Sequence, residues 1–305
     1  MSSPAESMAT PGSYGVHPTA YRLPAPTHVH SVVLQVSDLA RSRDFYERAL
    51  GFLPLTIVDD RVSLGAPGSE QPLTELVEVR GATRPPSRAR LGLYHVAILL
   101  PSRADLGRFL RHLDKLGIRA AAGDHLVSEA LYLQDPDNLG IEVYADRPQS
   151  DWRRRGQELL MATDSVDLPA LRAAAGNTSW TGMPRGTSIG HVHLHVGDIG
   201  RASEFYSETI GLDRMVWSYP GALFLAAGGY HHHLAVNTWA GADATAPAPE
   251  EPQLLEWTLL LSTGADVSDV AARLTNSGSQ ATAANGSVLT RDPWGTPLRL
   301  KAARP

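Results

Sequence analysis

Two stretches of the sequence, "VVLQVSDLARSRDFYERALGF" (residues 32–52) and "VHLHVGDIGRASEFYSETIGL" (residues 192–212), match each other at an offset of 160 residues. Each runs from alternating apolar residues, through an aspartate, into a helical pattern followed by a glycine. Alternation is typical of a strand with one buried face, aspartate favours the start of a helix and glycine favours its end. The two stretches therefore predict the same strand and helix twice, which indicates an internal repeat.

A second pair of stretches extends the repeat. "LYHVAILLPSRADLGRFLRHLDKLGI" (residues 93–118) resembles "LEWTLLLSTGADVSDVAARLTNSGS" (residues 255–279). Strand patterns around an Asp-Pro turn follow each of them, in "LYLQDPDNLGIEVY" (131–144) and "SVLTRDPWGTPLRL" (287–300). We therefore expect four copies of one strand–helix–strands unit, arranged as two pairs.

Composition narrows the class of protein. The 305 residues suffice for two domains, and a net charge of -5 without long runs of one sign argues against a nucleic-acid partner. The absence of cysteine excludes disulfides and thiolate metal sites, so that only His, Asp or Glu could hold a metal. Neither a membrane-spanning apolar segment nor a signal peptide is recognisable. We expect a cytoplasmic protein.

The motifs "VSDLARSRDFYERALGF", "DPDNLGIEVY", "GHVHLHVGDIGRASEFYSETIGL" and "DPWGTPLRL" resemble the vicinal oxygen chelate superfamily, which includes glyoxalase I, antibiotic-resistance proteins and extradiol ring-cleaving dioxygenases. "GLYHVAILLPSRADL" and "GGYHHHLAVNTWAG" are most similar to its two-domain catechol 2,3-dioxygenase-like branch. The resemblance covers about residues 22–302. It implies an α+β fold of four βαβββ modules, which form two incomplete barrels around a metal-binding funnel.

The predicted organisation follows the order of the modules along the chain. It has a flexible N-terminus (1–22), an N-terminal domain of two modules (23–147), a linker with a short helix (148–188) and a C-terminal domain of two modules (189–305). The linker helix is expected near Asp167. In this organisation modules one and two share a barrel, as do modules three and four.

For the C-terminal pair, the resemblance implies metal ligands on the first and last strands of each module. Alternation and the family pattern select His191 and His233, although a bulge would bring in His232 instead. Glu256 begins an apolar strand, where an unpaired carboxylate is costly, so a metal or an arginine partner is expected. The fourth position is Arg299. Two histidines and one carboxylate are typical of non-haem Fe(II) enzymes, so we expect Fe(II), with Mn, Ni or Zn as alternatives.

The equivalent positions of the N-terminal pair give a secondary candidate site of Glu75, His95 and Glu142, which could hold Mn²⁺, Ni²⁺ or Zn²⁺. Two histidines next to the first site, His193 and His195, are candidate catalytic acid–base groups. Arg299 is a further catalytic candidate, which either pairs with a substrate oxygen or neutralises Glu256.

The resemblance implies an extradiol dioxygenase of aromatic catabolism, with a small catechol-type substrate and O₂ as its partners. Two alternatives stay open. One is a glyoxalase-type metal-dependent isomerase or lyase that uses the secondary site. The other is a metal-free protein that sequesters an aromatic or antibiotic ligand. Modules of this family also pair across subunits, which leaves a homo-oligomer open.

Overall fold

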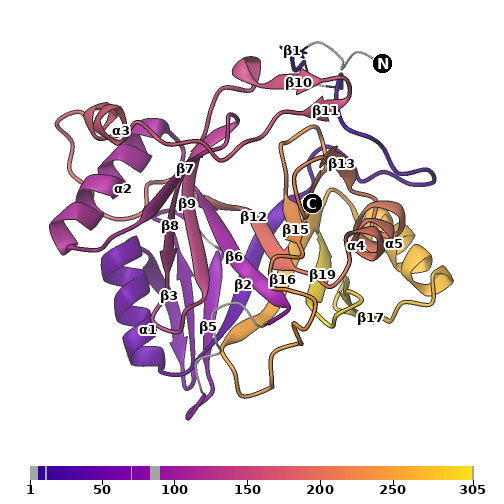
Figure 1. The fold of residues 1–305 in the computed structure, drawn as a ribbon. Coiled ribbons are helices and arrows are strands. Elements are labelled where there is room, and N and C mark those ends of the chain that lie inside the picture. Colours follow the sequence, from indigo (N-terminus) through magenta and orange to yellow (C-terminus); the bar gives the residue numbers. More distant parts are fainter. Residues whose placement is uncertain (1–5, 11, 70, 83–89, 304–305) are drawn as a thin grey trace.

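The computed structural model describes residues 6–10, 12–69, 71–82 and 90–303, whose strands form two eight-stranded sheets and one small sheet (Figure 1). In spatial order, the first sheet contains β13 (Asp213–Val216), β14 (Ala222–Ala226), β15 (Leu234–Asn237), β12 (Ser188–His195), β6 (Gly92–Leu99), β9 (Gly140–Asp146), β8 (Ser128–Gln134) and β7 (Ala121–Asp124). The second contains β17 (Ala281–Ala284), β18 (Ser287–Arg291), β19 (Pro297–Ala302), β16 (Gln253–Leu261), β2 (His28–Val36), β5 (Thr74–Glu78), β4 (Arg61–Gly65) and β3 (Leu53–Val58). The predicted α+β fold of repeated modules is confirmed.

Each module contributes one helical segment. The segments are α1 (Leu39–Phe45) with η1 (Tyr46–Leu50), α2 (Arg103–Leu116), α4 (Ile199–Ser203) with η3 (Glu204–Thr209), and α5 (Gly264–Asn276). Asp38 and Asp198 cap α1 and α4 by accepting hydrogen bonds from backbone N–H groups. Gly51 and Gly211 then reverse the chain at φ values of 86° and 106°, which favour glycine. These local predictions from the repeat are confirmed.

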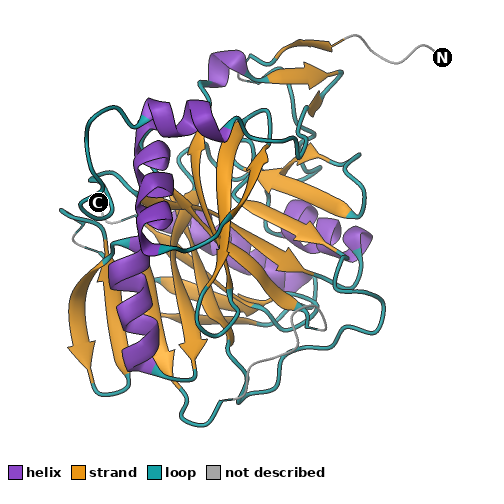
Figure 2. Ribbon diagram, turned by 60° about the vertical axis from the view of Figure 1, so that its left-hand side comes forward, coloured by secondary structure: helices purple, strands orange, loops and turns teal. Residues whose placement is uncertain are grey.

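The helices cover the sheets from two sides. In Figure 1, α1 and α2 lie on one side of the strands and α4 and α5 on the other, and Figure 2 shows the strands gathered between helices. The apolar residues of the alternating strands point toward the helices and are almost fully buried, as for Val192 and Leu194 of β12. The opposite face of β12 is thereby left to histidines.

The modules combine differently from the prediction. β6 of module two pairs antiparallel with β12 of module three, and β2 of module one pairs with β16 of module four. Each large sheet therefore unites strands from both halves of the chain, and the predicted split into 23–147 and 189–305 does not describe the sheets. Alternation specifies the buried face of each strand, but it does not specify which distant edge that strand joins.

The described N-terminal residues contact the rest of the chain, although a flexible segment was predicted over 1–22. β1 (Glu6–Met8) pairs with β10 (Arg153–Arg155), and β10 pairs with β11 (Glu158–Leu159). The buried hydroxyl of Tyr14 donates a 2.6 Å hydrogen bond to a backbone carbonyl, and Arg22 forms a 2.7 Å ion pair with Asp213. Residues 1–5 and 11 lie outside the described residues.

The linker contains a short 3-10 turn, η2 (Gln149–Asp151), and the predicted helix, α3 (Leu168–Ala174). Asp167 caps α3, and Pro169 lies in its first turn as expected. α3 lies against α2 of module two, and an ion pair joins Arg172 of α3 to Asp114 of α2. Within the described ranges, the helices are too short or too polar to span a membrane.

Candidate functional site

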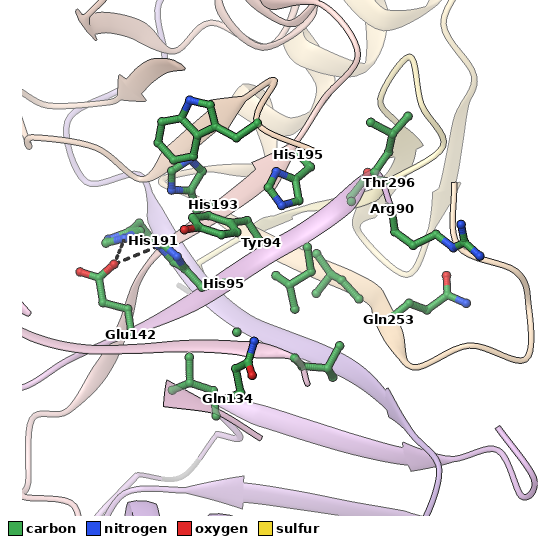
Figure 3. Close-up of a pocket in the computed structure, with 18 of the residues that line it drawn as sticks. Arg90, Tyr94, His95, Gln134, Glu142, His191, His193, His195, Gln253 and Thr296 are labelled. Carbon is green, nitrogen blue, oxygen red and sulfur yellow. Dashed lines mark hydrogen bonds and ion pairs between the residues drawn. The ribbon is translucent and has the colours of Figure 1, made fainter. Parts of the chain in front are cut away.

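The first sheet brings together three potential metal ligands from three adjacent strands. His95 lies on β6, Glu142 on β9 and His191 on β12. Glu142 Oε2 is 2.9 Å from His95 Nε2 and 3.3 Å from His191 Nε2 (Figure 3). One donor atom from each residue lies within 4.8 Å of the other two, so the group could hold a metal ion.

The strand register explains why these side chains meet. Ala97 on the central strand β6 is paired with His191 on one side and with Glu142 on the other. Directly paired residues on neighbouring strands point to the same face, and His95 shares that face because it lies two residues before Ala97. The methyl group of Ala97 leaves space between the larger side chains.

Burial and charge suit these three groups to metal coordination. Burial raises the pKa of Glu142, but the interactions with His191 and His95 outweigh it and lower that pKa well below its usual value. Burial lowers the pKa of His191 from 6.5 to about 4. The group therefore combines an ionised carboxylate with a neutral imidazole near neutral pH, which are the protonation states that metal ligation requires.

The hydrogen bonding of these residues also fits a bound metal. His191 Nδ1 is a buried ring nitrogen without a hydrogen-bond partner among the described residues. Leaving a buried polar atom without a partner is costly, and a metal ligated by this nitrogen would remove that cost. Two histidines and one carboxylate fit a divalent metal such as Fe(II).

The three residues lie at one end of a cavity of about 1340 Å³. The cavity extends past Tyr94 toward Arg90, Gln253 and Thr296 at its other end (Figure 3). Aromatic side chains form part of the wall next to the metal ligand candidates, and these are Tyr94, Tyr132, Tyr219, Phe224 and Trp239. The cavity therefore joins a polar, potentially metal-binding end to an aromatic wall.

The predicted catalytic residues His193 and His195 both line this cavity. Asn237 lies between them, because its side-chain amide is 2.8 Å from His193 Nε2 and its oxygen accepts a 2.6 Å hydrogen bond from His195 Nδ1. The ring of Tyr94 packs against both, with centroid distances of 5.0 and 4.7 Å. Burial lowers the pKa of His193 well below its usual value, so this imidazole is neutral.

His233 does not reach the cavity, which corrects its prediction as a ligand. Its Nδ1 accepts a 3.2 Å hydrogen bond from a backbone N–H, and its ring packs against Tyr230. His232 lines the cavity instead, with its ring centroid 4.0 Å from that of His191. The prediction failed because β15 begins only at Leu234, so strand alternation does not apply to the preceding histidines. His232 is the residue that the sequence analysis gave as the alternative to His233 if the strand contained a bulge.

Glu256 and Arg299 form a separate ion pair in the second sheet, where two guanidinium nitrogens of Arg299 each lie 2.6 Å from a carboxylate oxygen. The predicted set of His191, His233 and Glu256 is therefore not brought together. The alternative in which Arg299 neutralises Glu256 is confirmed, and Arg299 does not line the described cavity. Its predicted catalytic role therefore has no support from the geometry of this cavity.

The secondary candidate site is divided in the same way. Glu75 lies on β5 of the second sheet and forms a 2.7 Å ion pair with Arg61, whereas His95 and Glu142 lie in the first sheet. The structure thus joins two residues of the secondary set with His191 of the primary set. One feature of the sequence could have indicated this combination. The first strands of modules two and three carry a histidine at equivalent positions, His95 and His191.

The sequence is similar to a known protein family and to a characterised relative. Residues 28–143 match the Glyoxalase/Bleomycin resistance protein/Dioxygenase superfamily. Over 271 residues the chain is 42% identical to Catechol-2,3-dioxygenase of Bacillus subtilis (strain 168), covering 88% of this chain and 94% of that relative. The similarity therefore extends over both halves of the chain.

Solved structures confirm the fold. A protein of Bacillus subtilis strain 168 assigned as a dioxygenase superposes with a TM-score of 0.64 at 13% identity, covering 94% of this chain and 87% of that one. Glyoxalase I of Zea mays superposes with a TM-score of 0.53 at 16% identity, covering 90% and 92%. At these identities the likeness concerns the fold alone.

Proposed function

Because the chain belongs to the glyoxalase/bleomycin resistance protein/dioxygenase superfamily, we propose that it is a metal-dependent extradiol dioxygenase, which opens the ring of a catechol-type aromatic diol with O₂. The observation that carries the proposal is the 42% identity to a catechol-2,3-dioxygenase over 88% of the chain. Such an activity would belong to the catabolism of aromatic compounds.

The proposed metal ligands are His95, Glu142 and His191, with Fe(II) as the metal. Bound iron would supply the electron transfer that allows a diol to react with O₂. The chain contributes two imidazoles and one carboxylate on the rigid centre of a sheet. This set leaves coordination positions for the two hydroxyl oxygens of a diol and for O₂.

Neighbouring residues fit the remaining tasks. A proton leaves the diol when it coordinates, and His195 is proposed to accept it, since it lines the cavity. His193 also lines the cavity, but its Nε2 already accepts a hydrogen bond from the Asn237 amide. The rings of Tyr94 and Trp239 lie on the same wall, 5.8 Å apart between centroids, and would pack against the aromatic ring of the substrate. At about 1340 Å³, the cavity exceeds the roughly 300–1,000 Å³ of ordinary ligand pockets, so it has room for a substituted diol.

The proposal is tested by purifying the protein without oxygen, measuring its metal content and supplying Fe(II), catechol and O₂. We expect one iron per chain, consumption of one O₂ per catechol, and a ring-opened product. His191→Ala and His95→Ala should each abolish turnover and lower iron content.

Other outcomes would identify the alternatives. Retention of nickel or zinc with isomerase activity and without O₂ uptake would favour the glyoxalase-type enzyme. Ligand binding without any retained metal would favour the sequestering protein. Either result would contradict the dioxygenase proposal.

A further inference from the structure

The cavity carries positive charge that the proposed metal site does not use. Three arginines line it, Arg90, Arg119 and Arg291, whereas Glu142 is the only carboxylate residue in the lining among the described residues. The whole chain has a net charge of -5, so the charge of this wall is opposite in sign to that of the protein. A cleft lined by one sign of charge attracts ligands of the opposite sign.

The three arginines differ in their partners. Arg90 forms a bidentate ion pair with Glu251, with nitrogen–oxygen distances of 2.7 and 2.8 Å, so its charge is already balanced. The guanidinium of Arg291 donates a 2.7 Å hydrogen bond to the backbone carbonyl of Gly295. Within the described ranges, neither Arg291 nor Arg119 has a carboxylate partner, and both side chains are exposed. These two arginines therefore keep a charge that a ligand can pair with.

The backbone places both arginines away from the proposed metal ligands. Arg119 lies two residues before Ala121 of β7, and Ala121 is aligned with Glu142 across the intervening strand β8. Since neighbouring strands are about 4.8 Å apart and residues rise about 3.3 Å along a strand, the Cα atoms of Arg119 and Glu142 are roughly 12 Å apart. Arg291 ends β18 and begins the turn that contains Thr296, which Figure 3 shows at the end of the cavity away from Glu142. A substituent on the aromatic ring of a substrate is needed to span such a distance.

The remaining wall of the cavity suits an apolar substituent. Leucine and proline side chains form much of it, and these include Leu93, Leu133, Leu254, Pro247, Pro249 and Pro252. The side-chain amide of Gln35 fixes the proline-rich segment by donating hydrogen bonds to the backbone carbonyls of Pro249 and Glu251. Burial of methylene groups against apolar side chains is favourable. The cavity thus combines a potential metal site, an apolar wall and two cations without a carboxylate partner.

We propose that the substrate is a catechol with an alkyl side chain that ends in a carboxylate, and that Arg119 and Arg291 form a cationic rim that selects this carboxylate. Guanidinium groups form charge-assisted hydrogen bonds with carboxylates. The inference rests on the proposed dioxygenase function for the catechol part of the substrate, and it adds a substrate class and two specificity-determining residues. Because both arginines lie away from the reacting atoms, they should affect affinity and leave the chemical step unchanged.

The test uses the iron-loaded protein without O₂ and measures the dissociation constants of 5-(3,4-dihydroxyphenyl)pentanoic acid and of its primary amide by calorimetry. The two ligands share the catechol and the alkyl chain, but only the acid is negatively charged at neutral pH. We expect the acid to bind about fivefold more tightly, an effect of the size that exposed ion pairs typically have. This preference should decrease as the salt concentration rises, because salt screens exposed charges.

The variants locate the origin of the preference. Arg119→Gln combined with Arg291→Gln should bind the acid and the amide equally, whereas Arg119→Lys combined with Arg291→Lys keeps both charges and should keep most of the preference. Arg48→Gln is the matched control, because Arg48 is 72% exposed and does not line the cavity. It should retain the full preference. Catechol without a side chain should bind to all of these variants as it does to the wild type, and iron content should be unchanged.

Three results would overturn the inference. The first is equal affinity of the wild type for the acid and the amide, and the second is a preference that survives in the double glutamine variant. The third is an equal loss of preference in Arg48→Gln, which would show that only the net charge matters. Each of these leaves catechol cleavage intact. Wild-type protein that retains iron but cleaves neither catechol nor the acid once O₂ is admitted would instead refute the proposed function itself.

Discussion

At the scale of single residues, the histidines of this molecule differ in the atoms they contact rather than in their position in the sequence. His191 faces a carboxylate, His193 and His195 share Asn237, and His233 accepts a hydrogen bond from the backbone. Each contact assigns a lone pair or a proton to a particular ring nitrogen. The chemistry of each imidazole therefore follows from its partner.

His233 gives a prediction about stability and pH. Burial lowers its pKa from 6.5 to about 3. Between these pH values the unfolded chain binds a proton at His233 that the folded chain does not, so stability rises with pH over this range and the contribution is complete above about 6.5. In His233→Asn, the amide oxygen can accept the hydrogen bond from Ala227 without titrating.

We therefore expect the free energy of unfolding of His233→Asn to depend less steeply on pH between about 3 and 6.5 than that of the wild type. Urea unfolding of the metal-free proteins at several pH values measures this slope. Identical slopes for the two proteins would show that His233 is not responsible.

At the scale of secondary-structure elements, the close packing of β9 on β6 sets the distance between Glu142 and His95. Gly140 begins β9, and a Cβ atom at this position would lie 2.0 Å from the backbone oxygen of Tyr94. Backbone cannot yield as a flexible side chain can, so the two strands would have to move apart. Glycine at this position therefore supports the metal ligand geometry.

Gly140→Ala should lower the free energy of unfolding by about 1–3 kcal/mol, as overpacking typically does. It should also weaken metal binding, because His95 and Glu142 lie on the two strands that separate. Thermal unfolding and metal titration measure the two effects. A matched variant is Gly264→Ala at the start of α5, since no atom lies within 4 Å of a Cβ there and its φ is not positive, and it should leave metal affinity unchanged. Equal metal affinity in both variants would show that the spacing of β6 and β9 does not control metal binding.

The sequence predicts those parts of the elements that depend on interactions between neighbouring residues. The aspartate caps, the glycines after the helices and the Asp-Pro turns all follow from interactions within a few residues. The conformation of the residues just before β15 could not be predicted in this way. His231, His232 and His233 precede the strand, and their orientation depends on contacts with Asp146 and Tyr230.

At the scale of the whole molecule, the arrangement of the modules decides which residues share a site. The sequence identifies four modules, but two modules can pair in several ways without changing the periodicity of any strand. Neighbours along the chain were expected to pair, and the structure pairs module two with three and module one with four. The ligands predicted for one site, such as His191 and Glu256, therefore lie in two different sheets.

The charges of each sheet are consistent with the observed pairing. Glu75 and Glu256 of the second sheet are each neutralised by an arginine, Arg61 and Arg299. Glu142 of the first sheet has histidine partners instead. We therefore propose Glu142, rather than Glu75 or Glu256, as the carboxylate ligand of the metal.

The most direct test compares iron binding by Glu142→Gln and Glu256→Gln, both loaded with Fe(II) without oxygen. We expect Glu142→Gln to lower iron affinity at least about tenfold, and Glu256→Gln to retain about one iron per chain. Wild-type iron binding by Glu142→Gln, together with loss of iron from a folded Glu256→Gln, would contradict this proposal.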